Sequence, residues 1–195
     1  MGTSGWASHR TPWWIFAVIA VLIGGAVVVS LSQSPSQAQR AGDLRGYFRD
    51  VNAGVESCAG GLRDAQTAVR KVTSGDRAEY QTAVGILAYN AQNCSPANNQ
   101  SLQDFTNYQV PQSLATLGLD EADNSVITWA FEAQKAQNAM TAVLKANAPA
   151  ARASAEAALT SAMATLDAQR ARIYAIWHRA QRVTGDTSAL PGLPT

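Results

Sequence analysis

Residues 44–72 read LRGYFRDVNAGVESCAGGLRDAQTAVRKV, and this stretch decides the fold. Apolar or small side chains recur in it at alternating steps of four and three residues. These positions are Leu44, Phe48, Val51, Val55, Cys58, Leu62, Ala65, Val69 and Val72. Such a heptad pattern lines one side of an α-helix, because a helical turn takes about 3.6 residues. The stretch therefore predicts a long helix that packs one face against other helices.

Two adjacent glycines, Gly60 and Gly61, are the main local conflict with this helix. Each glycine inside a helix costs about 1 kcal/mol relative to alanine. A kink at this point is one interpretation of the pair.

The chain is predicted to fold back after this first helix. The sequence Thr73-Ser74-Gly75-Asp76 is typical of a turn, and the apolar pattern resumes from Tyr80 to Cys94 before Ser95-Pro96 ends it. The two segments therefore predict an antiparallel helical hairpin.

Two more helices are expected in the second half of the chain. One begins at Asp120-Glu121, and the other runs from Pro149 to near Gly185. We therefore predict an all-α fold, in which an N-terminal transmembrane helix precedes an antiparallel up-down-up-down four-helix bundle over residues 40–185. A disordered tail is expected at residues 186–195.

The transmembrane helix is predicted at residues 13–31. This run of 19 residues carries no charge and is long enough to cross most of a hydrocarbon layer about 30 Å thick. Trp13 and Trp14 suit the membrane interface, and a polar linker follows at residues 32–39. We therefore expect the lipid bilayer to be a partner of the chain through residues 13–31.

The flanking charges predict the orientation of this anchor. Arg10 precedes the apolar run, whereas no basic residue follows it until Arg40, so residues 1–12 are expected in the cytoplasm and the bundle on the extracytoplasmic side. The alternative is a cleaved signal peptide and a secreted protein, because Ser36-Gln37-Ala38 offers the small residues of a cleavage site. The bundle is exported in either case.

The two cysteines, Cys58 and Cys94, are predicted to form a disulfide. In a folded-back hairpin their heights differ by three residues, or about 4.5 Å, which a small tilt absorbs. An exported domain meets an oxidising compartment, where such a bridge persists. Two buried free thiols are the plainer alternative, and a redox pair is disfavoured because the Cys-x-x-Cys spacing is absent from the sequence.

The sequence offers little chemistry. The formal net charge of +1 does not indicate a nucleic-acid partner. His178 has no nucleophile placed beside it by a known motif, and Asp120, Glu121 and Asp123 are better explained as helix-start residues than as a calcium loop. We therefore expect no enzyme, no cofactor and no metal site.

Candidate partner contacts come from two places. Arg172, Arg179 and Arg182 lie among apolar residues of the last helix, as in basic helices that meet acidic surfaces, although an ordinary solvated helix face is the plainer interpretation. Phe105 and Tyr108 lie in the crossover Ser95–Leu119, the longest stretch without clear periodicity, where a short helix is expected to lie across the bundle end. If the chain has a binding site, the crossover is the first candidate.

These features favour a membrane-anchored extracytoplasmic interaction or scaffold protein of a bacterial cell envelope. Its partner is expected to be an envelope protein or a surface polymer. The alternative is a ligand-binding sensor bundle that acts with a partner subunit, since only about 12 residues remain for the cytoplasm. An enzyme is the third reading, and pairing with a second copy of the chain is left open.

Overall fold

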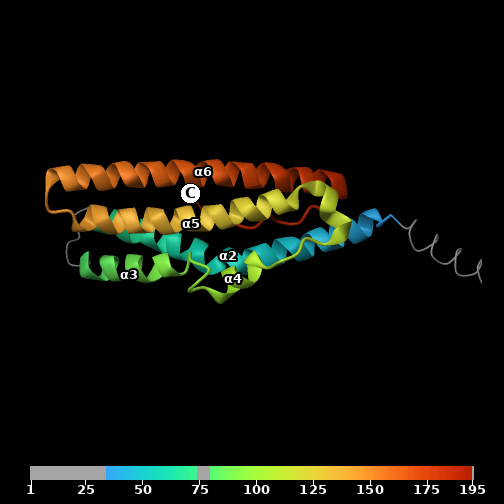
Figure 1. Cartoon of the computed structure of the whole chain (residues 1–195), viewed down its shortest axis with the longest axis horizontal. Coiled ribbons are helices and arrows are strands. Elements are labelled where there is room, and N and C mark those ends of the chain that lie inside the picture. Colours follow the sequence, from blue (N-terminus) through green and yellow to red (C-terminus); the bar gives the residue numbers. More distant parts are fainter. Residues whose placement is uncertain (1–33, 74–79, 195) are drawn as a thin grey trace, which may run out of the picture. The chain divides into compact units, whose positions relative to one another are not determined.

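A computed structural model describes residues 34–73 and 80–194 of the chain (Figure 1). The predicted anchor at residues 13–31, the N-terminus at 1–12 and the turn at 74–76 lie outside the described residues. Within the described part, no helix has both the length and the apolar character needed to cross a bilayer.

Every regular element among the described residues is a helix, as the all-α prediction requires. The elements are α2 (Gln37–Thr73), α3 (Tyr80–Gln92), α4 (Gln100–Thr106), the short 3₁₀ helix η2 (Gln112–Leu117), α5 (Leu119–Lys145) and α6 (Pro149–Thr184). The chain divides after Pro35, and residues 36–195 form one helical bundle.

The long helix α2 begins at Gln37, three residues before the predicted start of the bundle. Ser36 caps it, because its Oγ accepts a hydrogen bond from the backbone N–H of Gln39 at 3.1 Å. Part of the predicted linker 32–39 is therefore helical. The cap explains why the helix extends upstream of the heptad pattern.

The predicted face of α2 lies in the core. Its buried positions include Leu44, Phe48, Val51, Val55, Cys58, Leu62 and Ala65. Val69 packs against the edge of the same core. Tyr47, which the heptad pattern omits, is also fully buried.

Helices α5 and α6 lie side by side along their lengths (Figure 1). A glycine with positive φ stands at one end of each. Gly118 (φ 74°) precedes α5, and Gly185 (φ 72°) ends α6, where its N–H donates to the carbonyl of Gln181 at 2.8 Å. Pro149 opens α6, as predicted.

Helix α3 is much shorter than α2, and α4 packs against another part of α2 (Figure 1). The short helix expected across the bundle end therefore lies along the side of α2 instead. Gly54 allows this position, because a Cβ at residue 54 would come within 2.8 Å of the Cβ of Phe105.

The Gly60-Gly61 pair lies inside an uninterrupted helix. A Cβ at residue 61 would meet the Cβ of Asn90 on α3 at 2.9 Å, whereas a Cβ at residue 60 would meet nothing within 4 Å. Gly61 is therefore required for the close approach of α3 to α2, and Gly60 is not.

The C-terminal residues 186–194 pack on the bundle, which differs from the disordered tail expected from the sequence. The hydroxyl of Tyr174 donates to the carbonyl of Pro191 at 2.7 Å and accepts the N–H of Leu193 at 3.2 Å. Leu193 is buried, and the buried Asp186 pairs with Arg45 at 3.1 Å. These contacts come from residues far apart in the sequence, so a scan of local composition misses them.

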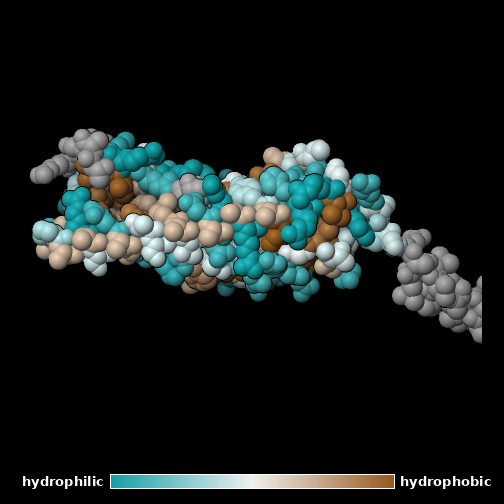
Figure 2. Space-filling view, turned by 90° about the horizontal axis from the view of Figure 1, so that it is seen from above, coloured by the Kyte–Doolittle hydropathy of each residue, from teal (hydrophilic) through white to brown (hydrophobic). Residues whose placement is uncertain are grey.

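The first half of α6 contributes few large side chains to the core. Residues 150–158 are alanine, arginine, serine and glutamate, and only Ala155 among them is buried. Figure 2, seen from above, shows residues of intermediate hydropathy running along this side between hydrophilic ones. This part of the bundle is therefore built mainly from small residues.

Candidate functional site

The predicted disulfide between Cys58 and Cys94 is present and joins α2 to the residues that follow α3. The two Cα atoms are 4.5 Å apart, and both side chains are fully buried. Gln137 of α5 places its Nε2 3.3 Å from the Sγ of Cys94. The bridge therefore fixes the α2–α3 pair in the core.

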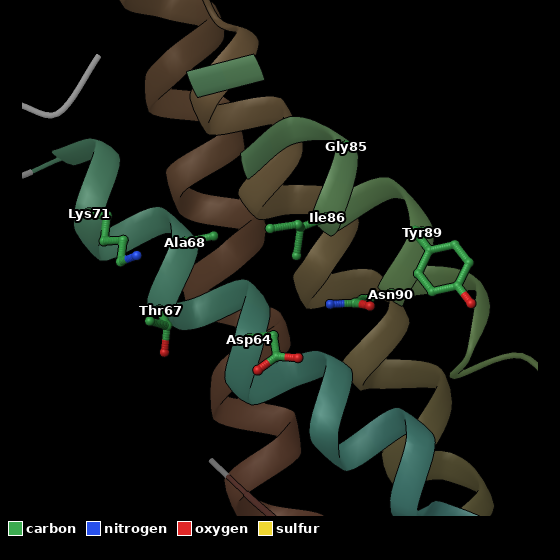
Figure 3. A pocket seen from close by; sticks show the side chains of 8 residues that line it. All are labelled: Asp64, Thr67, Ala68, Lys71, Gly85, Ile86, Tyr89 and Asn90. Carbon is green, nitrogen blue, oxygen red and sulfur yellow. The ribbon is translucent and has the colours of Figure 1, made fainter. Parts of the chain in front are cut away.

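A groove lies between α2 and α3, on the same pair of helices (Figure 3). We call it the hairpin groove, and its volume is about 490 Å³. It is lined by Asp64, Thr67, Ala68 and Lys71 of α2 and by Gly85, Ile86, Tyr89 and Asn90 of α3.

Small residues leave the space of the hairpin groove unfilled, and the buried amide of Asn90 fixes α3 against α2 beside it. Ala68 and Gly85 contribute almost no side-chain bulk. Asn90 points inward and donates from Nδ2 to the carbonyl of Gly61 at 3.2 Å (Figure 3). Because this bond is buried, it positions α3 more firmly than a solvent-exposed bond would.

Two large apolar side chains of α3 border the groove and reach the surface. Ile86 is 37% exposed and Tyr89 is 69% exposed. In Figure 3 the Tyr89 ring points away from α2, while Ile86 points into the space between the helices. Asp64 and Lys71 place one charge of each sign on the α2 side. An aromatic ring this exposed is available for contact with another molecule.

A second hollow lies at the crossover, where α4 rests on α2. We call it the crossover pocket, and its volume is about 270 Å³. It is lined by Asp50, Ala53, Gly54, Ser101, Asp104, Phe105 and Tyr108. The structure thus brings the two aromatic residues singled out from the sequence, Phe105 and Tyr108, to one hollow.

The two rings differ in their surroundings. Phe105 is buried against Gly54, so most of its ring serves the packing of α4 on α2. Tyr108 is half-buried and stacks on Phe105, with ring centroids 6.2 Å apart and planes 17° apart. Tyr108 is therefore the accessible aromatic residue of the pair.

The electrostatic environment of Tyr108 is negative. The pKa of its phenol is raised to about 12, chiefly by burial and then by the carboxylates of Asp50, Asp123 and Asp43, against a smaller opposite effect from Arg49. Asp43 accepts a hydrogen bond from Ser113, which ties η2 to α2 on this side.

A hydrogen-bond chain that starts in the core and ends at the half-buried Asp123 lies beneath the crossover. The indole Nε1 of Trp177 donates to the hydroxyl of Tyr47 at 3.2 Å, and that hydroxyl donates to Oδ1 of Asp123 at 2.7 Å. The pKa of Asp123 is raised to about 6, because the effect of burial, with a small addition from nearby Asp120, outweighs the lowering by the hydrogen bond from Tyr47. Burial and Asp123 also raise the pKa of Tyr47.

Sequence reasoning missed this chain, because it grouped Asp123 with the helix-start residues. Asp120 and Glu121 do lie in the first turn of α5, whereas Asp123 faces Tyr47 across the bundle. A hint in the sequence was Tyr47, a polar aromatic residue that precedes Phe48 and that the heptad pattern omits, but it does not identify Asp123 as the partner.

The arginines singled out from the sequence lie elsewhere. Arg172 pairs with Glu121 at 2.8 Å and lines a different hollow, and Arg182 lines another with His178 and the C-terminal tail. Arg179 is exposed. The structure therefore does not bring these arginines into the pocket of Phe105 and Tyr108.

Among residues 34–73 and 80–194, no three His, Cys, Asp or Glu side chains are grouped so that they could hold a metal ion. No protein-family model, curated protein or solved structure matches this chain.

Proposed function

We propose that this chain is a membrane-anchored, extracytoplasmic interaction protein of a bacterial cell envelope. Residues 13–31 serve as the anchor. The exported bundle has up-down-up-down topology, in which α3 and α4 together occupy the second helix position. Its partner is another envelope protein, which it meets at the hairpin groove.

The buried Cys58–Cys94 disulfide is the observation that carries this proposal. Disulfides persist in oxidising compartments and are rare in the reducing cytosol, so the bridge supports export of the bundle. The same bridge ties α3 to α2 directly beside the hairpin groove. A groove fixed in this way loses little conformational entropy when a partner binds.

The lining of the hairpin groove supports a protein partner over a polysaccharide. Ile86 and Tyr89 offer an apolar contact, and buried apolar and aromatic anchors dominate protein–protein binding energy. Asp64 and Lys71 place charges of both signs on the facing helix, so the groove favours neither a basic nor an acidic partner. The expected occupant is therefore a protein segment that presents an apolar side chain.

The topology is tested with one new thiol at each end. Both native cysteines are bridged, so an Ala189→Cys variant carries a single free thiol, at an exposed position of the C-terminal segment. We expect a membrane-impermeant maleimide to label it in intact cells at full-length mass. A Ser4→Cys variant is the matched control and should label only after lysis. Labelling of the Ala189→Cys variant only after lysis would contradict export, and labelling at a reduced mass would indicate cleavage near Ala38.

The contact face is tested by photo-crosslinking in intact cells. A photoreactive phenylalanine replaces Tyr89 in one variant and the exposed Ala168 of α6 in the control. We expect one crosslinked protein from position 89 and none from position 168. Ile86→Asp should abolish that product, whereas Gln81→Asp, an exposed change on the same helix but outside the groove, should keep it. A product that forms equally from both positions, or that survives Ile86→Asp, would argue against the hairpin groove as the contact.

A further inference from the structure

The crossover pocket gathers two carboxylates and a stacked aromatic pair in one hollow. Asp50 comes from α2 and Asp104 from α4, so the acids reach the pocket from two different helices. Phe105 and Tyr108 form its aromatic part. Its volume of about 270 Å³ lies just under the lower end of small-molecule sites, which begin at about 300 Å³.

The charges around this pocket favour a cation. Burial is the largest cause of the raised pKa of the Tyr108 phenol and favours no sign of charge, but the next causes are the carboxylates of Asp50, Asp123 and Asp43. The negative potential of these three groups favours a positive group at the same place. Arg49 is the opposing cation, and its Nε lies 3.8 Å from Oδ1 of Asp50. Gln100 donates to Oδ1 of Asp104 at 2.7 Å, which orients that carboxylate.

The aromatic pair distinguishes an organic cation from a metal ion. Ammonium groups bind over aromatic faces within about 6 Å of the ring centre, in addition to pairing with carboxylates. A calcium ion instead needs about six to eight oxygen ligands. Two carboxylates beside two rings suit an ammonium group better than a metal ion.

We propose that the crossover pocket binds the ammonium group of an alkylamine. Asp50 and Asp104 act as its counter-ions, and the ring of Tyr108 contacts the charged end of the alkyl chain. A free amine and a lysine side chain carry this same chemistry. The site is separate from the hairpin groove, because it lies between α2 and α4 rather than between α2 and α3.

Ligand-observed NMR titration of the full-length protein in detergent tests this proposal. The probes are 1,5-diaminopentane, N-acetyl-lysine amide and neutral 1-pentanol. We expect at least one amine to bind about tenfold more tightly than the alcohol. Added salt should weaken the binding of the amine and leave the binding of the alcohol unchanged. Tighter binding of 1,5-diaminopentane would identify a free amine as the natural ligand, and tighter binding of N-acetyl-lysine amide would identify a lysine side chain. Equal binding of the amines and the alcohol, or no binding of any probe, would overturn the proposal.

Variants locate the binding. The double variant Asp50→Asn and Asp104→Asn should bind the amine about tenfold or more weakly than the wild-type protein. Asp167→Asn, which neutralises an exposed acid of α6, should leave the affinity for the amine unchanged. Tyr108→Leu should weaken binding several-fold, whereas Tyr108→Phe, which keeps the ring, should not. Circular dichroism checks that each variant is folded. An equal loss of amine affinity in the Asp167→Asn variant would mean that binding depends on the overall charge of the protein, and it would contradict the assignment to the crossover pocket.

Discussion

The two ends of the bundle are held together by different means. One end, which we call the aromatic half, packs Tyr47, Phe48, Tyr108, Tyr174 and Trp177 with ring centroids 5.4 to 6.0 Å apart where they pair. The other, the small-residue half, contains α3 and the hairpin groove. Its buried side chains include Ala65, Ala68, Ala83, Ala133, Ala136, Ala139, Ala155 and Ala162.

The difference shows two solutions to the same packing problem. Large rings fill space and stay fixed by contacts and hydrogen bonds, as in the chain from Trp177 to Asp123. Small side chains bury little area each, so helices that carry them must approach closely and gain from a covalent link. The disulfide and Gly61 supply these conditions in the small-residue half.

The largest effect is expected from removing a ring in the aromatic half. Trp177 is fully buried, and Trp177→Ala should lower the free energy of unfolding by about 3 to 5 kcal/mol through lost burial and a cavity. Ala136→Gly in the small-residue half should cost only about 1 kcal/mol. Denaturant unfolding followed by circular dichroism measures both changes. Similar losses at the two sites would remove the contrast between the halves.

Removing the disulfide should weaken the small-residue half first. The bridge spans a sequence separation of 36 residues, and Cys58→Ala with Cys94→Ala should cost about 3 to 4 kcal/mol by the chain-entropy model. Hydrogen exchange should increase more at α3 than at the second half of α6. Uniform acceleration over both helices would show that the bridge stabilises the whole bundle equally.

The half-buried carboxylate of Asp123 in the aromatic half predicts a pH dependence. Because the pKa of Asp123 rises to about 6 in the folded protein, the folded state binds the proton more tightly than the unfolded state between about pH 4 and pH 6. Its contribution to stability is therefore full below pH 4 and is lost as the pH rises through 6. Between pH 4 and pH 7, the free energy of unfolding of the wild-type protein should fall by about 2 to 3 kcal/mol relative to that of the Asp123→Asn variant. Parallel stability curves for the two proteins would contradict this.

The smallest effects come from the adjacent glycines of α2. Gly61→Ala should destabilise the fold by about 1 to 3 kcal/mol, since its Cβ would overlap Asn90. Gly60→Ala should stabilise it by about 0.5 to 1 kcal/mol, because the new methyl meets nothing within 4 Å and glycine is a poor helix former. Thermal melting of the pair measures the difference. If Gly61→Ala also raised the melting temperature, α3 would have to move away from α2 at no cost in stability.

The helices and the disulfide could be predicted because they rest on local periodicity. The spacing from Leu44 to Ala65 marked the buried face of α2, and the hairpin geometry placed Cys58 opposite Cys94. The bond between Tyr47 and Asp123 could not be predicted, because it joins residues 76 apart. The hairpin groove escaped notice for a similar reason. The apolar pattern of α3 shows which of its faces is buried, but the groove is lined by residues of two helices, and neither helix alone reveals how closely they approach.

Gly54, Cys58 and Gly61 also constrain how the length of α2 can change during evolution. These residues meet Phe105, Cys94 and Asn90 in turn, so three contacts must keep their spacing at once. One inserted residue between Gly54 and Gly61 would rotate the glycines by about 100° relative to each other, and seven would separate them by about 10 Å more. Insertions and deletions should therefore be excluded from this stretch in any descendant that keeps the bridge.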